Sequence, residues 1–507
     1  MDKLLHSQSH VPDILDTITK LSSNEVPTPP EIANAIINSF PEQLWKDPEL
    51  KILDPFCKSG VFLREIAKRL FEGLKDQFPD ENKRREHIFQ NMLYGVAITR
   101  MSSLMSRRSV YYTKDASSKY SVVKFDNPDG NILYENIDHI FNERITACDI
   151  CKAPEKWVTE RKERPETLDL HAYQFIHDTK LFDEMRFDIV IGNPPYQIED
   201  GGFGASATPI YQLFVEQAFR LKPRYVSMII PSRWFAGGKN LDEFRDKMLQ
   251  ESKFKKLVDF PDASDIFPDI KLEGGVCYFL WDNQHDGPCE VVTMKSGAQE
   301  SAFERYLGEF DVLVRFNSAV PIIRKVLKKT NNFADSIFES SKPFGMRTFF
   351  KEYSKTKKPG FLNLYLKGQQ KYFVDPKYVT KNHELINKYK VLTSKGYGMG
   401  SYPSKVILSP FIAGKGTVCT ETYQVAGTFD TKKEAENFKK FLETKFARFL
   451  IAMRKNTQDL TKDKMKFVPL LDMKKEWTNN ALYKEYNITT AEQKFIDTIV
   501  SDLNKNE

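Results

Sequence analysis

Apolar positions along the first part of the chain, to about residue 285, alternate between short continuous runs and stretches with helical spacing. One run, Phe187–Gly192, is almost entirely apolar, which is typical of a central parallel strand that is buried on both faces. A helix is expected from about Val61 and another over Ile210–Leu221. Further strands are expected at 51–53, 93–98, 225–230, 255–260 and 276–281. This alternation predicts an α/β domain with a mostly parallel sheet.

The pattern changes after the segment 283–297, which is predicted to be a connector. The residues that follow are irregular and rich in Lys, Gly, Tyr and Phe. One helix is expected there, because Thr431 and Glu434 have the spacing of a capping box. Its apolar face would comprise Phe438, Leu442, Phe446, Phe449 and Met453. We therefore predict one domain over 1–285 and a second, mixed α/β domain over 286–507.

The amino-acid composition limits the classes of protein to which this chain can belong. The chain has 507 residues, of which 41% are hydrophobic, so two or three domains can each bury a core. A net charge of +6 does not by itself establish a polyanionic partner, but it suits a protein with one basic face. Six cysteines with a single close pair do not form the pattern of a secreted disulfide protein. Because we find no apolar leader and no run of membrane length, we expect a reduced, cytoplasmic protein.

The most informative motif is Asn193-Pro194-Pro195-Tyr196, which directly follows the apolar run at 187–192. Ligands of open α/β sheets bind beyond the carboxyl ends of the strands, where this motif would lie. The Asn193 side-chain oxygen and the Pro194 carbonyl can both accept hydrogen bonds from one planar amino group. Tyr196 offers a flat face on which a base can stack. The alternative, an ordinary Pro-rich turn that closes a strand, is disfavoured by the α/β context.

A second motif, Asp54–Leu63 (DPFCKSGVFL), has the pattern of a strand, a loop and a helix, with its loop at the same edge of the sheet. Glycine in such a loop lets the backbone approach a cofactor closely. An acid at the end of the strand can bind an ammonium or a ribose group. Taken alone, this motif is equally well explained as a plain strand–helix turn.

Together, the two motifs resemble those of the gamma-arranged N6-adenine DNA methyltransferases of restriction–modification systems, the type II restriction–modification methylase family. In that family the cofactor motif precedes the catalytic motif, and a target-recognition domain follows at the C-terminus. The resemblance implies a class I, Rossmann-like methyltransferase domain with a mostly parallel seven-stranded sheet. It also implies S-adenosylmethionine as the cofactor and double-stranded DNA as the partner. The methyl group would go to N6 of an adenine that is flipped out of the duplex.

The resemblance implies roles for individual residues as well. Asn193 and Pro194 would hold the amino group, while the rings of Tyr196 and Phe267 would enclose the flipped base. The segment 26–30 is similar to the family's N-terminal cofactor segment, and Asp178 stands where the family places an acid that faces the cofactor's adenine. The full set of residues expected at the cofactor is Thr28, Pro29, Asp54, Pro55, Cys57, Gly60 and Asp178.

Two positions depart from the family's pattern. Lys58 stands where the cofactor loop usually has Gly, which puts the path of the loop in doubt. Ala97 stands where the second strand should end in an acid that binds the ribose hydroxyls. Either another group binds the ribose, or the affinity for the cofactor is reduced.

A predicted insertion at about 111–171 holds a close pair of cysteines, Cys148 and Cys151. With His139 and His171, this pair has the residue types of a tetrahedral structural zinc site. His177 is a weaker ligand candidate, because its neighbour in the sequence is already assigned to the cofactor. One pair is weak evidence, and two reduced cysteines in a loop remain the alternative.

The C-terminal segment 394–405 interleaves basic, aromatic and glycine residues. DNA contacts are expected from Lys395, Tyr397 and Lys405, because glycine permits close approach to phosphates, lysine supplies charge and tyrosine can stack. Arg233 and Lys239, just past a strand of the sheet, are expected to contact DNA near the flipped base. Each of these segments, taken alone, is explained at least as well as an ordinary surface loop.

Other functions fit parts of the sequence. Methyltransferases of RNA or of protein glutamine have a similar Asn-Pro-Pro-Tyr motif, but they typically lack a long C-terminal domain. A decayed cofactor site, suggested by Lys58 and Ala97, would leave a non-catalytic DNA-recognition subunit of a restriction or defence complex. The intact Asn193-to-Tyr196 segment favours the active enzyme. We find no nuclease constellation, so a cognate restriction endonuclease is expected to be a separate chain.

Overall fold

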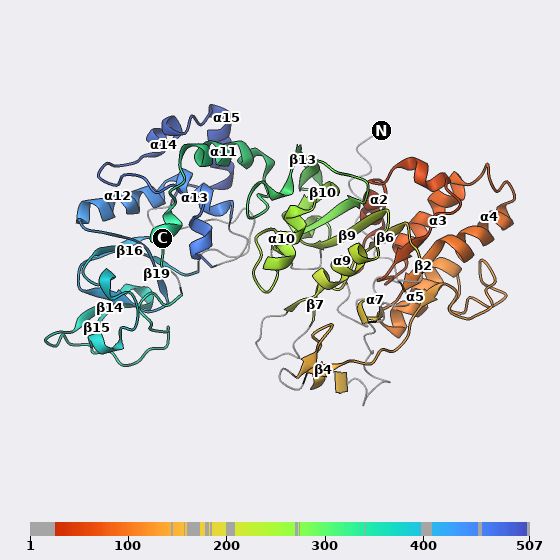
Figure 1. Cartoon of the computed structure of the whole chain (residues 1–507), viewed down its shortest axis with the longest axis horizontal. Helices are drawn as coiled ribbons and strands as arrows, with labels where there is room; N and C mark the ends of the chain where they lie inside the picture. The colour runs from red at the N-terminus through yellow and green to blue at the C-terminus, as the bar shows by residue number, and fades with distance from the viewer. Residues whose placement is uncertain are drawn as a thin grey trace. The chain divides into compact units, whose positions relative to one another are not determined.

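The computed structural model describes residues 26–142, 146–156, 158–159, 173–177, 182, 185–198, 208–268, 272, 274–339, 341–396, 408–454 and 459–503. The chain divides into two compact units, residues 1–311 and 312–507 (Figure 1). Each unit has its own sheets and its own buried side chains. Within the described ranges, no helix is long and apolar enough to cross a membrane.

A nine-stranded sheet forms the centre of the first unit, in the order β13-β12-β10-β11-β9-β6-β1-β2-β3. The neighbours from β9 to β3 pair in parallel, whereas β11 runs antiparallel to both β9 and β10. The mostly parallel sheet expected from the sequence is therefore confirmed, and β12 and β13 extend it beyond seven strands. The strands are β1 (Ile52–Asp54), β2 (Leu93–Val96), β3 (Ile132–Leu133), β6 (Ile189–Gly192), β9 (Tyr225–Pro231), β10 (Phe254–Phe260), β11 (Val276–Asp282), β12 (Cys289–Lys295) and β13 (Ala298–Arg305).

Strand β6 shows why the apolar run was a sound basis for predicting a strand. Each of its four residues is buried, and it pairs with β1 on one side and β9 on the other. A strand in the middle of a parallel sheet is apolar on both faces because neither face meets water. The helices and turns of this unit are α2 (Pro30–Ile37), η1 (Glu42–Lys46), α3 (Val61–Gly73), α4 (Glu81–His87), α5 (Arg100–Tyr111), α7 (Gln174–His177), α9 (Tyr211–Arg220), η3 (Ser232–Phe235) and α10 (Asp242–Gln250).

The segment predicted as a connector, 283–297, instead carries β12 and the turn into β13. Strand β12 pairs in parallel with β10, and the Lys256–Glu290 ion pair, 3.0 Å, joins the two strands. Ser296 and Gly297 both have positive φ, as the two central residues of a tight hairpin turn require. The first compact unit therefore extends to residue 311 and not to 285.

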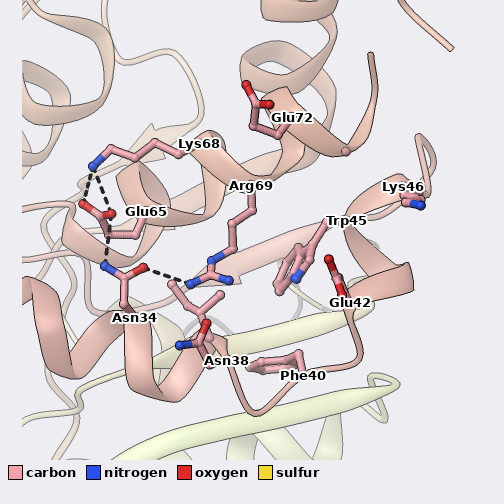
Figure 2. Close-up of a pocket in the computed structure, with 12 residues that line it drawn as sticks. Asn34, Asn38, Phe40, Glu42, Trp45, Lys46, Glu65, Lys68, Arg69 and Glu72 are labelled. Carbon is pink, nitrogen blue, oxygen red and sulfur yellow. Dashed lines mark hydrogen bonds and ion pairs between the residues drawn. The ribbon is translucent and has the colours of Figure 1, made fainter. Parts of the chain in front are cut away.

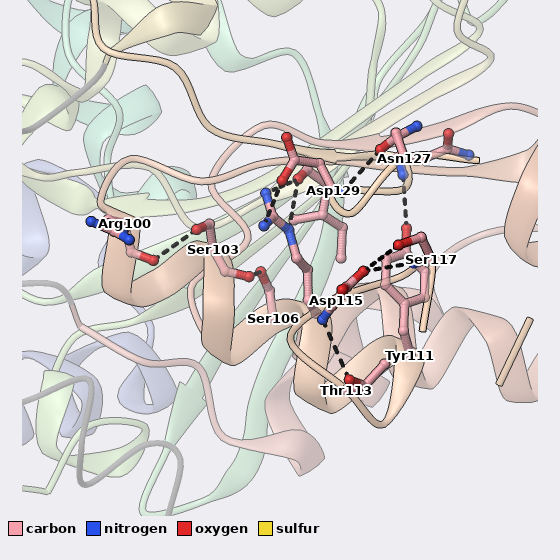
Figure 3. A network of polar contacts seen from close by, with 12 residues as sticks. Arg100, Ser103, Ser106, Tyr111, Thr113, Asp115, Ser117, Asn127 and Asp129 are labelled. Atoms are coloured by element: carbon pink, nitrogen blue, oxygen red, sulfur yellow. Dashed lines mark hydrogen bonds and ion pairs between the residues drawn. The ribbon is translucent and has the colours of Figure 1, made fainter. Parts of the chain in front are cut away.

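Part of the predicted insertion also belongs to the sheet. Strand β3 pairs with β2, and Ala97 donates its backbone N–H to the Leu133 carbonyl. Arg107 on α5 fixes the approach to β3, because it pairs with Asp129 at 2.7 Å and donates to the Ile132 carbonyl. Figure 3 shows this polar network along α5 and the turn that follows it. The insertion relative to a minimal fold thus begins after β3.

The second unit has two three-stranded sheets whose inner faces share one hydrophobic cluster. One sheet has the order β15-β14-β18 and the other β17-β16-β19. Its strands are β14 (Leu362–Leu366), β15 (Gln370–Val374), β16 (Tyr389–Ser394), β17 (Phe411–Ala413), β18 (Thr417–Cys419) and β19 (Tyr423–Phe429). Its helices are α11 (Val320–Lys329), α12 (Lys432–Glu443), α13 (Lys445–Ala452), α14 (Asn479–Glu485) and α15 (Thr490–Ile499).

The single C-terminal helix predicted from residue 431 is two helices. The capping box of Thr431 and Glu434 is present at the start of α12, as expected. Thr444 then takes an extended conformation, with φ −63 and ψ 148, and its hydroxyl accepts a hydrogen bond from the Ala447 N–H. Thr444 thus ends α12 and caps α13 at once. The predicted apolar face is still buried: α12 buries Phe438 and Leu442, and α13 buries Phe446 and Phe449.

Candidate active site

The two motifs singled out in the sequence meet at the carboxyl edge of the sheet. Strands β1 and β6 are parallel neighbours, with Ile52 opposite Ile189, so the loops that follow them start side by side. Gly192 ends β6, and a methyl group built on it would lie 2.8 Å from Asp54 Oδ1. Only glycine leaves room for the end of β1 to come this close. The predicted cofactor motif and the Asn193 loop therefore lie next to each other.

Asn193 is buried, and its side-chain amide is fixed by two acceptors. Its Nδ2 atom donates to the Val26 carbonyl at 3.0 Å and to Thr28 Oγ1 at 3.1 Å. Because both acceptors face one end of the amide, that end must be the nitrogen. The Oδ1 atom is also buried, and no group among the described residues donates to it. The Asn193 amide is thus fixed in orientation, and its Oδ1 atom is available to accept a hydrogen bond from a ligand.

Tyr196 carries a second buried polar atom for which the described part of the chain offers no partner. Its ring packs partly buried against the main hydrophobic cluster of the first unit. The hydroxyl meets the geometric criteria for a hydrogen bond with no group among the described residues. Burial raises the pKa of the Tyr196 phenol well above its usual value, although the nearby Asn193 side chain pulls the pKa down. Two such atoms in one four-residue loop indicate a place for a polar ligand.

Asp54 is the buried acid of the site. Its side chain is 2% exposed, and Oδ1 accepts a hydrogen bond from the Phe56 N–H at 3.0 Å. Burial raises the pKa of this carboxyl to about 7, although the Phe56 N–H and the charge of Lys58 pull the pKa down. A cation that approached Asp54 would favour the charged carboxylate, so the site suits a positively charged ligand.

Lys58, the first departure from the family's pattern, has a clear structural contact. Its Nζ atom donates to the Val26 carbonyl at 2.7 Å, and its side chain is almost fully buried. The same carbonyl accepts the hydrogen bond from Asn193. Lys58 and Asn193 therefore both anchor the N-terminal segment: Lys58 binds it at Val26, and Asn193 binds it at Val26 and Thr28. The sequence did not reveal this contact, because a backbone carbonyl has no side-chain signature.

The rest of the cofactor loop is buried as well. Cys57 donates its backbone N–H to the Val96 carbonyl at 3.0 Å, and its sulfur lies 3.8 Å from Ser106 Oγ on α5. Gly60, with φ +74, stands at the N-terminus of α3 in a conformation that favours glycine. Pro55, which follows Asp54 at the start of the loop, is buried. Ala97, the second departure, is fully buried and brings no acid to the loop.

Other predicted residues of the first unit lie as follows. Thr28 is buried, and Pro29 precedes the first residue of α2. Phe267 belongs to the same hydrophobic cluster as Tyr196 and is 3% exposed. Asp178 and His171 lie outside the described residues.

The predicted DNA contacts are only partly described. Arg233 is partly buried on η3, and Lys239 is exposed just after it. Lys395, at the end of β16, pairs with Asp459 at 3.7 Å, and both side chains are about half exposed. Tyr397 and Lys405 lie outside the described residues.

The insertion brings four potential metal ligands together. Three of them are ligands that the sequence predicts: His139, Cys148 and Cys151. The fourth is His177, the weaker candidate in the sequence. The ligand atoms of all four lie within 4.8 Å of one another. The sequence favours His171, because the neighbour of His177 is assigned to the cofactor, and His171 lies outside the described residues.

A separate surface pocket of about 760 Å³ lies between α2, η1 and α3 (Figure 2). Asn34 joins its polar groups, since it donates to Glu65 at 3.2 Å and accepts from Arg69 at 3.0 Å. None of the residues assigned to the site lines this pocket.

The sequence is similar to that of known proteins over more than half of its length. A family model described as "Eco57I restriction-modification methylase" matches residues 91–267. An "Uncharacterized adenine-specific methylase" of Mycoplasma pneumoniae is 34% identical over 322 residues, which cover 58% of this chain and 75% of that protein.

Two solved structures are similar at low identity. A nuclease-deletion mutant of the Type ISP restriction-modification enzyme LlaGI, in complex with a DNA substrate mimic, has a TM-score of 0.48 and 14% identity, covering 95% of this chain. The type IIG restriction endonuclease BpuSI has a TM-score of 0.40 and 11% identity, covering 96% of this chain. This chain spans 55% and 62% of the lengths of those two proteins.

Proposed function

Because this chain belongs to the family of adenine-specific methylases, we propose that its Asn193-to-Tyr196 loop is the place where an adenine amino group is methylated. The chain is a DNA adenine methyltransferase of the restriction–modification type. The observation that carries the assignment to this loop is the buried Oδ1 atom of Asn193, which accepts no hydrogen bond from any of the described residues.

The residues beside this loop fit S-adenosylmethionine, the methyl donor that methyltransferases of this family use. The cofactor, when bound, supplies an electrophilic methyl group on a positively charged sulfur. The buried carboxyl of Asp54 suits a cationic ligand, and Gly192 leaves the loops after β1 and β6 in contact. Thr28, Pro29, Pro55, Cys57 and Gly60 would line the same site, and Asp178 would face the cofactor's adenine.

Asn193 acts on the substrate by position. Its Oδ1 accepts one N6 hydrogen and the Pro194 carbonyl accepts the other, so the nitrogen's lone pair is drawn out of conjugation with the ring. The nitrogen would then be able to displace the neutral thioether from the methyl group, as the carbon–sulfur bond breaks, and the proton that the nitrogen loses would pass to solvent. The two hydrogen bonds from Nδ2 keep the amide from rotating, so the acceptor is in place before the base arrives.

Tyr196 and Phe267 would enclose the flipped adenine. Tyr196 already lies at the margin of the hydrophobic cluster, whereas Phe267 is 3% exposed and must uncover one face of its ring to stack on a base. Flipping is needed because the amino group of a paired adenine cannot reach an enclosed methyl donor.

The second unit would select the DNA sequence. Lys395 is suited to a phosphate, because its exposed pair with Asp459 is weak and easily exchanged. Tyr397 and Lys405 would contact DNA in the same segment, while Arg233 and Lys239 would do so beside the flipped base. A cognate restriction endonuclease would be a separate chain.

Product analysis tests this function. The full chain is incubated with S-adenosylmethionine that carries a tritiated methyl group and, in parallel, with plasmid DNA, total RNA or a protein extract. The acceptors are then hydrolysed and the labelled product is identified. We expect label in N6-methyladenine from DNA, lost in Asn193→Ala and kept in the control Asn480→Ala, which changes an exposed asparagine of α14. Label in RNA or protein alone would contradict the proposal, as would DNA binding without any methylation.

A further inference from the structure

The insertion that follows β3 contains a cluster of two cysteines and two histidines. Cys148 and Cys151 are buried, and His139 and His177 are partly buried. The four residues come from separate places: His139 precedes β4 (Phe141–Asn142), Cys148 ends β5 (Ala147–Cys148), Cys151 follows in the next turn, and His177 ends α7. The fold has therefore brought four metal-binding side chains together from three segments.

A tight backbone turn directs both sulfur atoms to the cluster. Strand β4 pairs with β5, and the Cys148 N–H donates to the Ala153 carbonyl at 2.8 Å. The Lys152 N–H in turn donates to the Cys148 carbonyl at 3.0 Å, and Lys152 has φ 61. A non-glycine residue rarely adopts this conformation, so the turn is specifically held. It serves to place Cys148 and Cys151 on the same side.

The distances within the cluster suit a tetrahedral ion. The Cys151 sulfur lies 3.4 Å from His139 Nδ1, and the Cys148 sulfur lies 4.0 Å from His177 Nε2. In a tetrahedron with Zn–S and Zn–N bonds of ordinary length, ligand atoms are about 3.3–3.8 Å apart. All four ligand atoms lie within 4.8 Å of one another, about 1 Å beyond the largest of these values.

The cluster is poorly explained as ordinary packing. Cys148 and Cys151 are buried and the two histidines are partly buried, so the four ligand atoms face one another with little access to water. The six cysteines are free thiols, so Cys148 and Cys151 do not form a disulfide. Neutral thiols and imidazoles make only weak hydrogen bonds with each other. A cation is what would bind all four atoms well.

We propose that His139 Nδ1, Cys148 Sγ, Cys151 Sγ and His177 Nε2 bind one structural zinc ion. Two thiolates with two imidazoles favour zinc over magnesium or calcium, which prefer oxygen ligands. Four protein ligands leave no open position for a water, so the ion stabilises the fold and takes no part in methyl transfer. Zinc binding releases the thiol protons of both cysteines to solvent.

The site would connect the insertion to the cofactor loop. His177 is the last residue of α7, and Phe175 of the same helix packs against Phe56 with 5.8 Å between ring centres. Phe56 follows Asp54 in the cofactor loop and also packs against Phe214 of α9 at 5.1 Å. A zinc ion at His177 would therefore hold the end of a helix that supports this loop.

Zinc content tests the site. The full chain is purified without chelator, and zinc is measured by mass spectrometry against protein concentration. We expect about one zinc ion per chain. Cys151→Ser and His177→Ala should lose most of it, while Cys289→Ser, which removes a buried cysteine of β12, should keep it. His171→Ala should also keep its zinc. Wild-type protein without zinc, or Cys151→Ser with unchanged zinc, would overturn the proposal.

Cobalt substitution keeps the test decisive if a variant does not fold. Wild-type protein is stripped of metal and titrated with Co²⁺ while its visible spectrum is recorded. We expect the intense absorption of tetrahedral cobalt, together with thiolate charge-transfer bands, saturating at about one ion per chain. Weak octahedral bands, or no bands, would overturn the proposal. The measurement does not depend on methyl transfer, so it is independent of the proposed function.

Discussion

The side-chain nitrogen of Asn193 donates to the backbone carbonyl of Val26 over 3.0 Å, although 167 positions separate the two residues. This bond, with a second one to Thr28, sets the orientation of the amide. The oxygen is consequently left as a buried acceptor at the carboxyl edge of the sheet. The N-terminal segment thus fixes the side chain that we propose to act on adenine.

Lys58→Met should weaken the binding of S-adenosylmethionine by about ten-fold or more, because a hydrogen bond from a charged group contributes roughly 1.5–3 kcal/mol. The substitution removes the donor to the Val26 carbonyl and keeps the length of the side chain. Calorimetric titration of the full chain measures the effect. Lys68→Met is the control, because Lys68 is exposed on α3 and pairs with Glu65. Equal affinities of the two variants would show that Lys58 does not support the site.

Gly192→Ala should lower the thermal stability of the chain and impair cofactor binding together. The new methyl group would lie 2.8 Å from Asp54 Oδ1 and 2.9 Å from a ring carbon of Phe56, so β6 and the cofactor loop must move apart. Overpacking of this kind costs about 1–3 kcal/mol. Gly287→Ala is the control, because its added methyl group meets only His285, at 3.5 Å. A variant as stable as wild type would contradict the close packing of the two loops.

The raised pKa of Asp54 predicts that the stability of the chain and its affinity for the cofactor both change with pH. Since the folded chain keeps this carboxyl protonated up to about pH 7, whereas the unfolded chain releases the proton near 3.8, stability should fall as pH rises between those values. Cofactor affinity should rise over the upper part of the same interval, because the ionised carboxylate attracts a cationic ligand. Calorimetry at several pH values measures this, and Asp54→Asn corrects for titration of the cofactor itself. Parallel profiles for the two proteins would refute the role of Asp54.

Removal of the proposed zinc ion should loosen the cofactor loop. Chelation should lower the melting temperature and weaken cofactor binding, because α7 would lose its anchor at His177 and support Phe56 less firmly through Phe175. Addition of zinc should restore both quantities. If the metal-free chain melts and binds as before, the site does not support the loop, whatever its zinc content.

The sheet was largely predictable, and the reason is physical. Central parallel strands such as β6 are apolar on both faces, so their sequence alone marks them. Strand β13 was missed because most of its residues are exposed and polar, although Ser296 and Gly297 carry the signal of a hairpin turn. The break at Thr444 was missed because apolar residues continue across it with helical spacing.

The candidate site was predictable only in its side chains. Residue type and position in the two motifs are enough to predict that Asn193, Tyr196 and Asp54 belong to the site. The contact of Lys58 with a backbone carbonyl has no such signature, so the residue looked like a defect in the motif. The place of His177 beside the two cysteines likewise depends on where a helix ends, which spacing along the chain does not determine.

The most direct test of the central claim is the single-turnover rate of methyl transfer by Asn193→Ala. The rate is measured with DNA and S-adenosylmethionine each at a concentration well above its dissociation constant. If Oδ1 holds the adenine amino group, the rate should fall at least about 100-fold, the effect usual for losing one positioned polar group in an active site. Cofactor affinity, measured separately, should change much less. A transfer rate within a few-fold of wild type would contradict the account, because the buried acceptor would then have no part in the reaction.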